Sequence, residues 1–172
     1  MSAQNWPLIA SWIKQSEGGF VDNPRDPGGA TNYGITLRTL SAWRKMPCTV
    51  DDIGALTWGD AREIVKTLYW DTVHGDELPA GLDYCVADAA VNSGPVQAIK
   101  WLQRSLGIVA DGRFGPVTAQ AVKSIRDPKA AIERYDAARL GFMRHLRTWP
   151  VFGRGWFARV NLVTERAKGL TA

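Results

Sequence analysis

Hydrophobic residues recur along most of the chain with the spacing of an α-helix. Near the N-terminus, one helical face is formed by Trp6, Ile9, Trp12 and Ile13. The pair Gly18-Gly19 is expected to end this helix, because glycine readily adopts the conformation that follows a last helical turn. Residues 82–92 are apolar on nearly every side, which predicts a helix buried in the core.

Further helices are predicted where a capping residue or a Gly-Pro pair precedes a periodic stretch. They cover residues 37–45, 57–70, 95–106, 116–125, 128 onward and 156–167. Residues 20–36 are dense in Pro, Gly, Asn and Asp, which favours an ordered loop or a small irregular hairpin. We therefore expect an all-α fold with at most a very small β-hairpin near residues 20–36. The length of 172 residues favours a single domain over residues 1–172.

The composition is that of a folded globular protein, with 45% apolar and 22% charged residues. No apolar run approaches the roughly 20 residues that span a bilayer. Residues 1–14 lack a basic segment followed by a long apolar one, so no signal peptide is expected.

Charge is distributed unevenly along the chain. Residues 1–90 hold 7 Lys and Arg against 12 Asp and Glu, a net charge of −5, whereas residues 91–172 hold 14 against 5, a net charge of +9. This asymmetry favours an anionic polymer as a partner of the second half. The alternative is a solvated helix surface, since the charges are spread out. Nucleic acid is not expected as a partner, because no groove-reading motif is present.

The two cysteines, Cys48 and Cys85, offer little chemistry. Cys85 lies in an apolar helical stretch, where a buried and inert thiol is expected. Two cysteines without a nearby histidine cannot form a zinc site, and nothing in the sequence argues for a disulfide. We expect no metal and no cofactor.

Glu17 is the first candidate for catalysis. It lies in the final turn of the first predicted helix, where the partial negative charge of the helix end disfavours a carboxylate. The same field, together with any burial, would raise the pKa of the Glu17 carboxyl, as a general acid requires. The alternative is an exposed glutamate that merely fills the end of an amphipathic helix.

Asp26 follows nine residues later, in a loop rich in glycine and proline that can fold back over the helix end. Nearby hydroxyl and amide groups come from Thr31, Asn32, Tyr33 and Thr36. Glycoside cleavage requires a protonated acid and a second carboxylate that stabilises positive charge or activates water. Asp26 alternatively serves the turn Asp26-Pro27-Gly28-Gly29 by accepting backbone N–H bonds.

Polar and aromatic side chains elsewhere suggest a cleft. Asp88 and Asn92 lie four residues apart on one face of the apolar helix, so they either satisfy local donors or bind sugar at a cleft. Trp70, Trp156 and Tyr33 could present flat faces to sugar rings, although most tryptophans belong to the core.

Several motifs resemble those of a known family. Residues 17–36, EGGFVDNPRDPGGATNYGIT, resemble the N-terminal signature of the glycoside hydrolase family 108 muramidases, also called putative secretion-activating proteins. Trp70 and the runs DAAVNSGP at 88–95 and GWFARV at 155–160 are similar too. Residues 94–122 look like the peptidoglycan-binding-type C-terminal region of that family. More distantly, Glu17, Asp26 and Thr31 or Asn32 are similar in spacing to the catalytic triad of T-even phage lysozyme.

The resemblance implies a lysozyme-like α fold and N-acetylmuramidase activity of the lysozyme type. Glu17 matches the catalytic acid of the family, and Asp26 and the pair Thr31 and Asn32 fall at the lysozyme-like positions. The resemblance also implies a catalytic part at 1–93 and a peptidoglycan-binding-like helical part at 94–172, integrated into the same fold. The substrate-binding candidates are Asn32, Tyr33, Thr36, Trp70, Asp88 and Asn92.

On this hypothesis Glu17 protonates the glycosidic oxygen, Asp26 stabilises the developing cation or positions water, and Thr31 or Asn32 holds that water. The sequence leaves open whether the reaction retains or inverts the configuration at the anomeric carbon. The rival enzyme is a lytic transglycosylase, and a non-catalytic wall-binding or secretion-accessory protein is the alternative of another class.

The expected partner is peptidoglycan. The basic second half is expected to bind anionic wall or outer-membrane polymers as well. We expect the protein to be a monomer. We expect synthesis in the cytoplasm and action on the cell wall after release, as for a phage endolysin, although a chromosomal origin fits equally.

Overall fold

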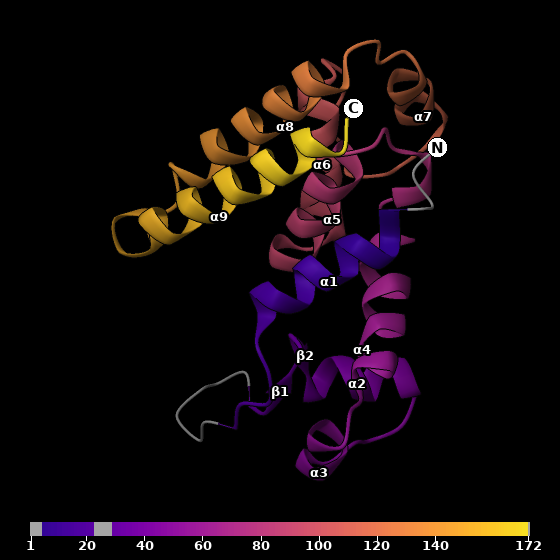
Figure 1. Cartoon of the computed structure of the whole chain (residues 1–172), viewed down its shortest axis with the longest axis vertical. Coiled ribbons are helices and arrows are strands. Elements are labelled where there is room, and N and C mark those ends of the chain that lie inside the picture. Colours follow the sequence, from indigo (N-terminus) through magenta and orange to yellow (C-terminus); the bar gives the residue numbers. More distant parts are fainter. Residues whose placement is uncertain (1–4, 23–28, 172) are drawn as a thin grey trace. The chain divides into compact units, whose positions relative to one another are not determined.

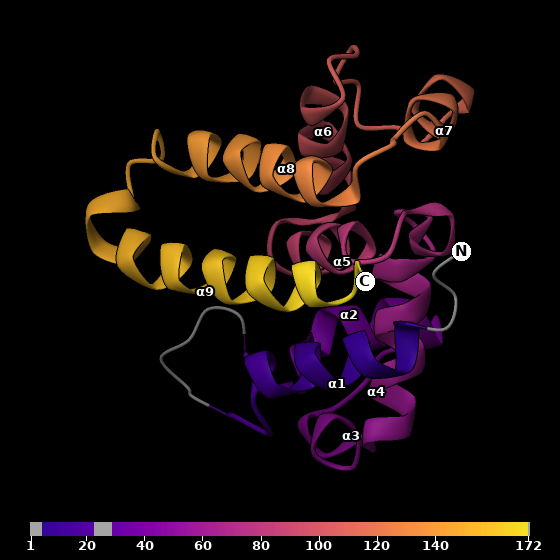
Figure 2. The ribbon, with the colours of Figure 1, turned by 45° about the horizontal axis from the view of Figure 1, so that its top comes forward.

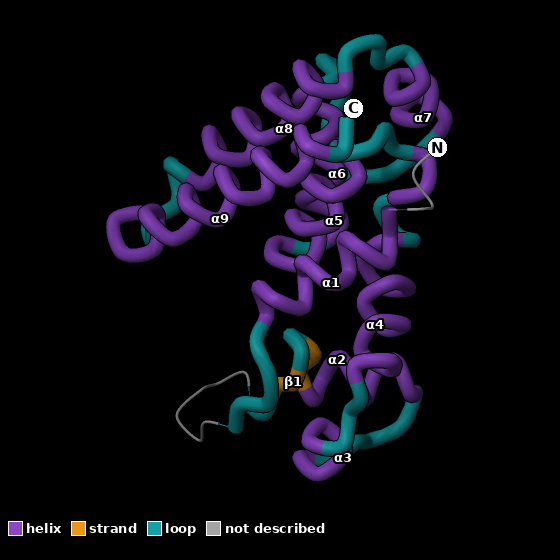
Figure 3. Tube along the Cα trace, in the orientation of Figure 1, coloured by secondary structure: helices purple, strands orange, loops and turns teal. Residues whose placement is uncertain are grey.

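The computed structural model describes residues 5–22 and 29–171, of which helices form the greater part (Figures 1 and 3). The strands of the described residues are β1 (Thr31–Asn32) and β2 (Ile35–Thr36). The expected all-α class with a very small hairpin is thereby confirmed. Packing divides the chain into two compact units, Trp6–Leu68 and Met1–Asn5 with Tyr69–Ala172, which we call the N-terminal and the C-terminal unit. The arrangement of the whole chain as one domain stays a prediction.

The N-terminal unit begins with α1 (Trp6–Glu17). Its apolar face includes Ile9 and Ile13, both fully buried, as the helical spacing predicts. The helix ends at Gly18, whose φ of +79° lies in the left-handed region that only glycine adopts without strain. The prediction that glycine ends this helix is therefore confirmed.

The hairpin is closed by a two-residue turn. Asn32 pairs with Ile35, and the intervening Tyr33 and Gly34 have φ values of 51° and 76°. Positive φ at both central residues is the signature of a type I′ turn, which suits the twist of paired strands. Gly34 accepts this conformation readily, whereas Tyr33 is held in a conformation that side chains other than glycine seldom adopt.

Short capped helices complete the N-terminal unit. They are α2 (Leu37–Arg44), α3 (Val50–Gly54) and α4 (Trp58–Val65). The π-helical turn that follows, Lys66–Trp70, continues past the end of this unit at Leu68. Thr57 and Asp60 form one capping box, and Thr49 and Asp52 form a second. The helix α3 was not predicted, because its five residues are too few to show a period.

The C-terminal unit is built around α5 (Leu82–Ser93), whose residues 82–90 are all buried. This confirms the predicted core helix. Around it pack α6 (Pro95–Ser105), α8 (Pro128–Met143) and α9 (Trp149–Gly169), while α7 (Pro116–Lys123) follows α6 along the chain. The helices α8 and α9 lie side by side and run in opposite directions (Figures 1 and 2). The last helix begins seven residues before the predicted start, with Pro150 in its first turn.

The loop between α6 and α7 is held by Gln103. Its buried amide donates to Asp111 Oδ1 at 2.7 Å and to Thr118 Oγ1 at 3.1 Å, and its Oε1 accepts from Gly112 N at 2.8 Å. Gly112 has a φ of +80°, and an added Cβ would lie 2.8 Å from Val96 Cγ1. These residues belong to the motif at 94–122, so its polar positions stabilise the loop.

Candidate active site

Glu17 is the last residue of α1. The carbonyl groups of the last helical turn carry partial negative charge, and a carboxyl group placed there favours its neutral form. The side chain of Glu17 and the whole of Asp26 lie outside the described residues. Their assignment as acid and second carboxylate therefore stays a prediction.

The chain that leaves Glu17 returns to the same place. Val21 and Thr31 exchange both backbone hydrogen bonds, each with an N···O distance of 2.8 Å. This antiparallel bridge ties the segment after Glu17 to the start of β1. Thr31 itself is half-buried. The structure thus ties Thr31 by its backbone to Val21, four residues after Glu17.

An aromatic pair with a cation lies at the hairpin turn. The rings of Tyr33 and Trp58 meet edge to face with centroids 5.6 Å apart, and Lys14 Nζ lies 5.5 Å from the first centroid and 5.0 Å from the second. Both rings are half-buried, so each keeps exposed surface. Exposed aromatic faces suit the apolar faces of sugar rings. Trp58 was missed from the sequence, where only its position after the cap Thr57 marks it.

Two other candidates of the hairpin have structural contacts. Asn32 is buried, and its amide donates to Ile53 O at 3.0 Å and to Leu56 O at 3.4 Å. Thr36 caps α2 by accepting from Thr39 N at 3.1 Å. Both groups hold neighbouring segments in place, which gives them positioning roles rather than open donors for a ligand.

Trp70 belongs to the core of the C-terminal unit. Its ring is fully buried, and its indole N–H donates to Asp76 Oδ1 at 2.9 Å. The ring lies so close to Gly75 that an added Cβ there would be 2.4 Å away. The ring has no exposed face in this structure, and the substrate-binding role of Trp70 stays a prediction.

Asp88 is a fully buried carboxylate between two arginines. Its Oδ2 accepts from Arg139 Nη1 at 2.8 Å, and its Oδ1 accepts from Arg159 Nε at 3.0 Å and Nη2 at 2.9 Å. Both oxygens are thereby occupied. Of the two interpretations of Asp88, the structure favours the one in which the carboxylate accepts hydrogen bonds from donors within the fold. It gives no support to a direct contact between Asp88 and sugar.

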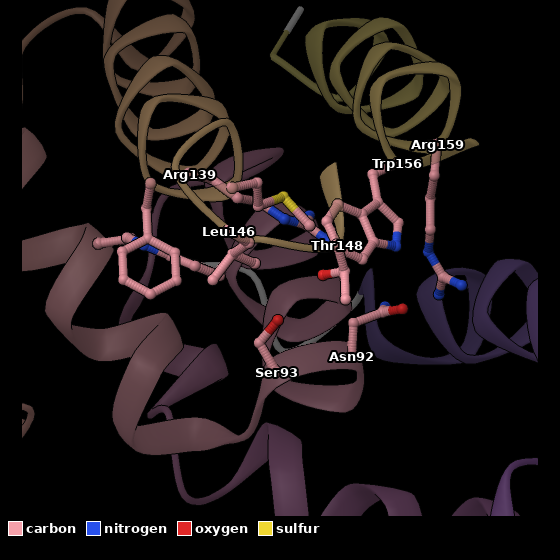
Figure 4. A pocket seen from close by; sticks show the side chains of 10 residues that line it. Asn92, Ser93, Arg139, Leu146, Thr148, Trp156 and Arg159 are labelled. Carbon is pink, nitrogen blue, oxygen red and sulfur yellow. The ribbon is translucent and has the colours of Figure 1, made fainter. Parts of the chain in front are cut away.

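Asn92 lies one turn further along α5 and donates to Asp88 O at 2.7 Å. Unlike Asp88, it lines a pocket of about 310 Å³ in the C-terminal unit. Figure 4 shows Asn92 and Ser93 at the end of α5, with Thr148 and Trp156 pointing toward them. The remaining lining residues are Trp101, Arg139, Phe142, Met143, Leu146 and Arg159. Of the residues that the sequence analysis singled out, Asn92 and Trp156 thus line this pocket.

Asp136 is a buried acid that the sequence did not single out. Its Oδ2 accepts from Thr164 Oγ1 at 2.6 Å and lies 3.7 Å from Cys85 Sγ. Burial raises the pKa of Asp136 from 3.8 to about 6, against the opposing effects of the Thr164 hydrogen bond and Arg139. Burial, helped by Asp136, also raises the pKa of the Cys85 thiol, and the prediction that Cys85 is buried is confirmed.

This raised pKa predicts a pH dependence of stability. The fold favours the protonated form of Asp136, so its contribution is complete below pH 3.8 and is lost as the pH rises through 6. An asparagine side chain does not titrate, and the Asp136→Asn variant should therefore gain stability relative to the wild type by on the order of 2 kcal/mol between pH 4 and pH 7. Urea unfolding of both proteins across this range measures the difference. If the difference in unfolding free energy between the two proteins stays constant across this pH range, the raised pKa of Asp136 is contradicted.

Within residues 5–22 and 29–171, no group of three or more His, Cys, Asp or Glu is placed to hold a metal ion. None of the helices described in this structure has the length and apolar character needed to cross a bilayer.

Comparisons with known proteins cover both parts of the chain. Residues 10–94 match the family model described as glycosyl hydrolase 108, and residues 97–161 match a model described as a predicted peptidoglycan domain. The solved structure of Brucella abortus SagA is similar, with 40% sequence identity, a TM-score of 0.88, and coverage of 98% of this chain and 96% of that one. No curated protein matches the chain.

Proposed function

Because this chain belongs to the glycosyl hydrolase 108 family and carries a peptidoglycan-binding-like domain, we propose that it hydrolyses the N-acetylmuramic acid–N-acetylglucosamine bond of peptidoglycan. The observation that carries this proposal is the position of Glu17. It ends α1 within the matched region 10–94, where the helix end favours a neutral carboxyl group. A neutral carboxyl group is what a general acid needs at the start of the reaction.

The reaction balances as a hydrolysis. Glu17 gives its proton to the glycosidic oxygen while the bond from that oxygen to the anomeric carbon of the muramic acid breaks. The positive charge that develops on the muramic acid ring is stabilised by the Asp26 carboxylate. Water adds its oxygen to the anomeric carbon, and the proton that it releases restores the protonated form of Glu17, directly or through solvent. The muramic acid is left with a free reducing end.

Neighbouring residues support the binding of a glycan strand. The exposed surfaces of Tyr33 and Trp58 offer aromatic faces at the hairpin turn, and Lys14 lies over the same pair. Thr31 is tied by its backbone to the segment after Glu17, and its hydroxyl is assigned to the attacking water. Asn32 and Thr36 keep the hairpin in shape through their bonds to the 53–56 segment and to α2.

The products identify the reaction. Purified sacculi would be digested, reduced with borohydride and analysed by mass spectrometry. We expect muramitol at the new ends, because hydrolysis frees the anomeric carbon of muramic acid. Reduced glucosamine ends would assign cleavage to the other glycosidic bond, and 1,6-anhydromuramic ends would identify a lytic transglycosylase. Intact sacculi that retain bound protein would identify a non-catalytic wall-binding protein.

A further inference from the structure

The pocket beside Asn92 has no role in the proposed chemistry of Glu17. All its lining residues belong to the C-terminal unit, and all from Trp101 to Arg159 lie within the region matched to the peptidoglycan domain. Its volume of about 310 Å³ is at the lower end of the range for small-molecule sites. A ligand of the size of a dipeptide or a single sugar would fill such a space.

Two buried N–H donors at this pocket lack an acceptor within the described part of the chain. Trp101 and Arg139 line it and are each 1% exposed. Among the residues that the structure describes, neither Trp101 Nε1 nor Arg139 Nε has a hydrogen-bond partner. Buried donors of folded proteins are nearly always paired, so two unpaired donors at one cavity indicate an acceptor that arrives with a ligand.

The charged residues that line the pocket indicate which kind of acceptor group a ligand would present there. Its described residues include two arginines, Arg139 and Arg159, and no carboxylate. Asp88 pairs with both guanidinium groups and holds them in place. Asp88 itself is fully buried and is not among the residues that line the pocket. A guanidinium group held in a fixed position pairs well with a planar carboxylate. Phe142, Met143 and Leu146 add apolar surface beside this polar end.

We propose that this pocket binds a carboxylate carried on a small apolar group of peptidoglycan. Two sources present this chemistry: the C-terminal alanine of a stem peptide and the lactyl group of a muramic acid without its peptide. The carboxylate accepts from Trp101 Nε1 and from the Arg139 guanidinium, and the methyl group contacts Leu146 and Met143. The choice of a peptidoglycan ligand rests on the proposed function, whereas the preference for a carboxylate rests on the lining.

Nuclear magnetic resonance of the full chain tests this proposal through the indole N–H signals. N-acetyl-D-alanyl-D-alanine and N-acetylmuramic acid are titrated separately, each beside its carboxamide analogue. We expect at least one acid to shift the Trp101 indole signal, with its amide binding at least tenfold more weakly. The acid that binds more tightly identifies the source. Absence of binding by both acids, or equal binding of acid and amide, would overturn the proposal.

Variants locate the site. Trp101→Phe identifies the Trp101 signal by its disappearance and should weaken acid binding about tenfold, since one charge-assisted hydrogen bond is lost. Trp43→Phe, at an exposed tryptophan of the N-terminal unit, is the matched control and should bind normally. If Trp101→Phe does not fold, Thr148→Trp at an exposed rim position should block the pocket. Unchanged binding in the folded variant would refute the site.

The two proposals can fail separately. Glu17→Gln should retain carboxylate binding, because Glu17 belongs to the other unit. A wild-type protein that hydrolyses sacculi without binding either acid would refute the pocket alone. A protein that binds an acid but leaves sacculi uncut would refute the proposed function alone.

Discussion

Glu17→Gln is expected to lower the rate of clearing of purified cell walls at least hundredfold. Glutamine keeps the shape of the side chain but has no acidic proton to give to the leaving sugar. A positioned general acid contributes about 10²–10⁴ in rate, and a hundredfold loss corresponds to about 2.7 kcal/mol of transition-state stabilisation. The measurement is the initial rate of turbidity loss with equal amounts of folded protein.

The matched control for this variant is Glu63→Gln. Glu63 is an exposed glutamate of α4 in the same N-terminal unit, so the same substitution is made without touching the proposed acid. We expect clearing within about twofold of the wild type, because exposed substitutions usually change little. Equal rates for Glu17→Gln and Glu63→Gln would refute the role of Glu17.

Asp88→Asn is expected to cost about 3–5 kcal/mol in the free energy of unfolding, the largest stability effect that we predict. Asparagine has nearly the same volume but no charge, so Arg139 is left buried at 1% exposure without its counter-ion. Typical domains have only about 5–15 kcal/mol of total stability, so much of the variant would unfold under mild denaturation. Urea unfolding followed by circular dichroism measures this loss.

Asp51→Asn provides the control, because Asp51 is exposed in the short helix α3. This substitution should change the free energy of unfolding by no more than about 0.5 kcal/mol. A second comparison adds Arg139→Met to Asp88→Asn, which removes the unpaired buried charge and should recover part of the lost stability. A loss below about 1 kcal/mol in Asp88→Asn would mean that the buried ion pair contributes little.

Most of the fold could be predicted from the sequence because its signals are local. The apolar face of α1, the glycine after Glu17 and the capping pair Thr57 and Asp60 depend on neighbours within a few residues. The core helix α5 was evident because residues 82–90 contain so few polar groups. The start of α9 was missed, since its first residues are apolar on exposed as well as buried sides.

The site was harder to predict because it depends on contacts between distant residues. Sequence showed that a buried Asp88 needs a partner, but Arg139 and Arg159 lie 51 and 71 residues away. Trp70 and Trp58 are both tryptophans at helical positions, and only packing shows that the first is buried and the second half-exposed. Asn92 lines a pocket, whereas nothing in the sequence indicates the two donors there, Trp101 Nε1 and Arg139 Nε, that lack a partner among the described residues.

The most direct test of the central claim is digestion of purified sacculi in water labelled with oxygen-18, by the wild type and by Glu17→Gln side by side. Hydrolysis with Glu17 as the acid predicts one labelled oxygen at each new muramic acid reducing end from the wild type. The variant should yield about one hundredth as many ends or fewer. Unlabelled anhydro ends from the wild type, or equal yields from both proteins, would contradict the account.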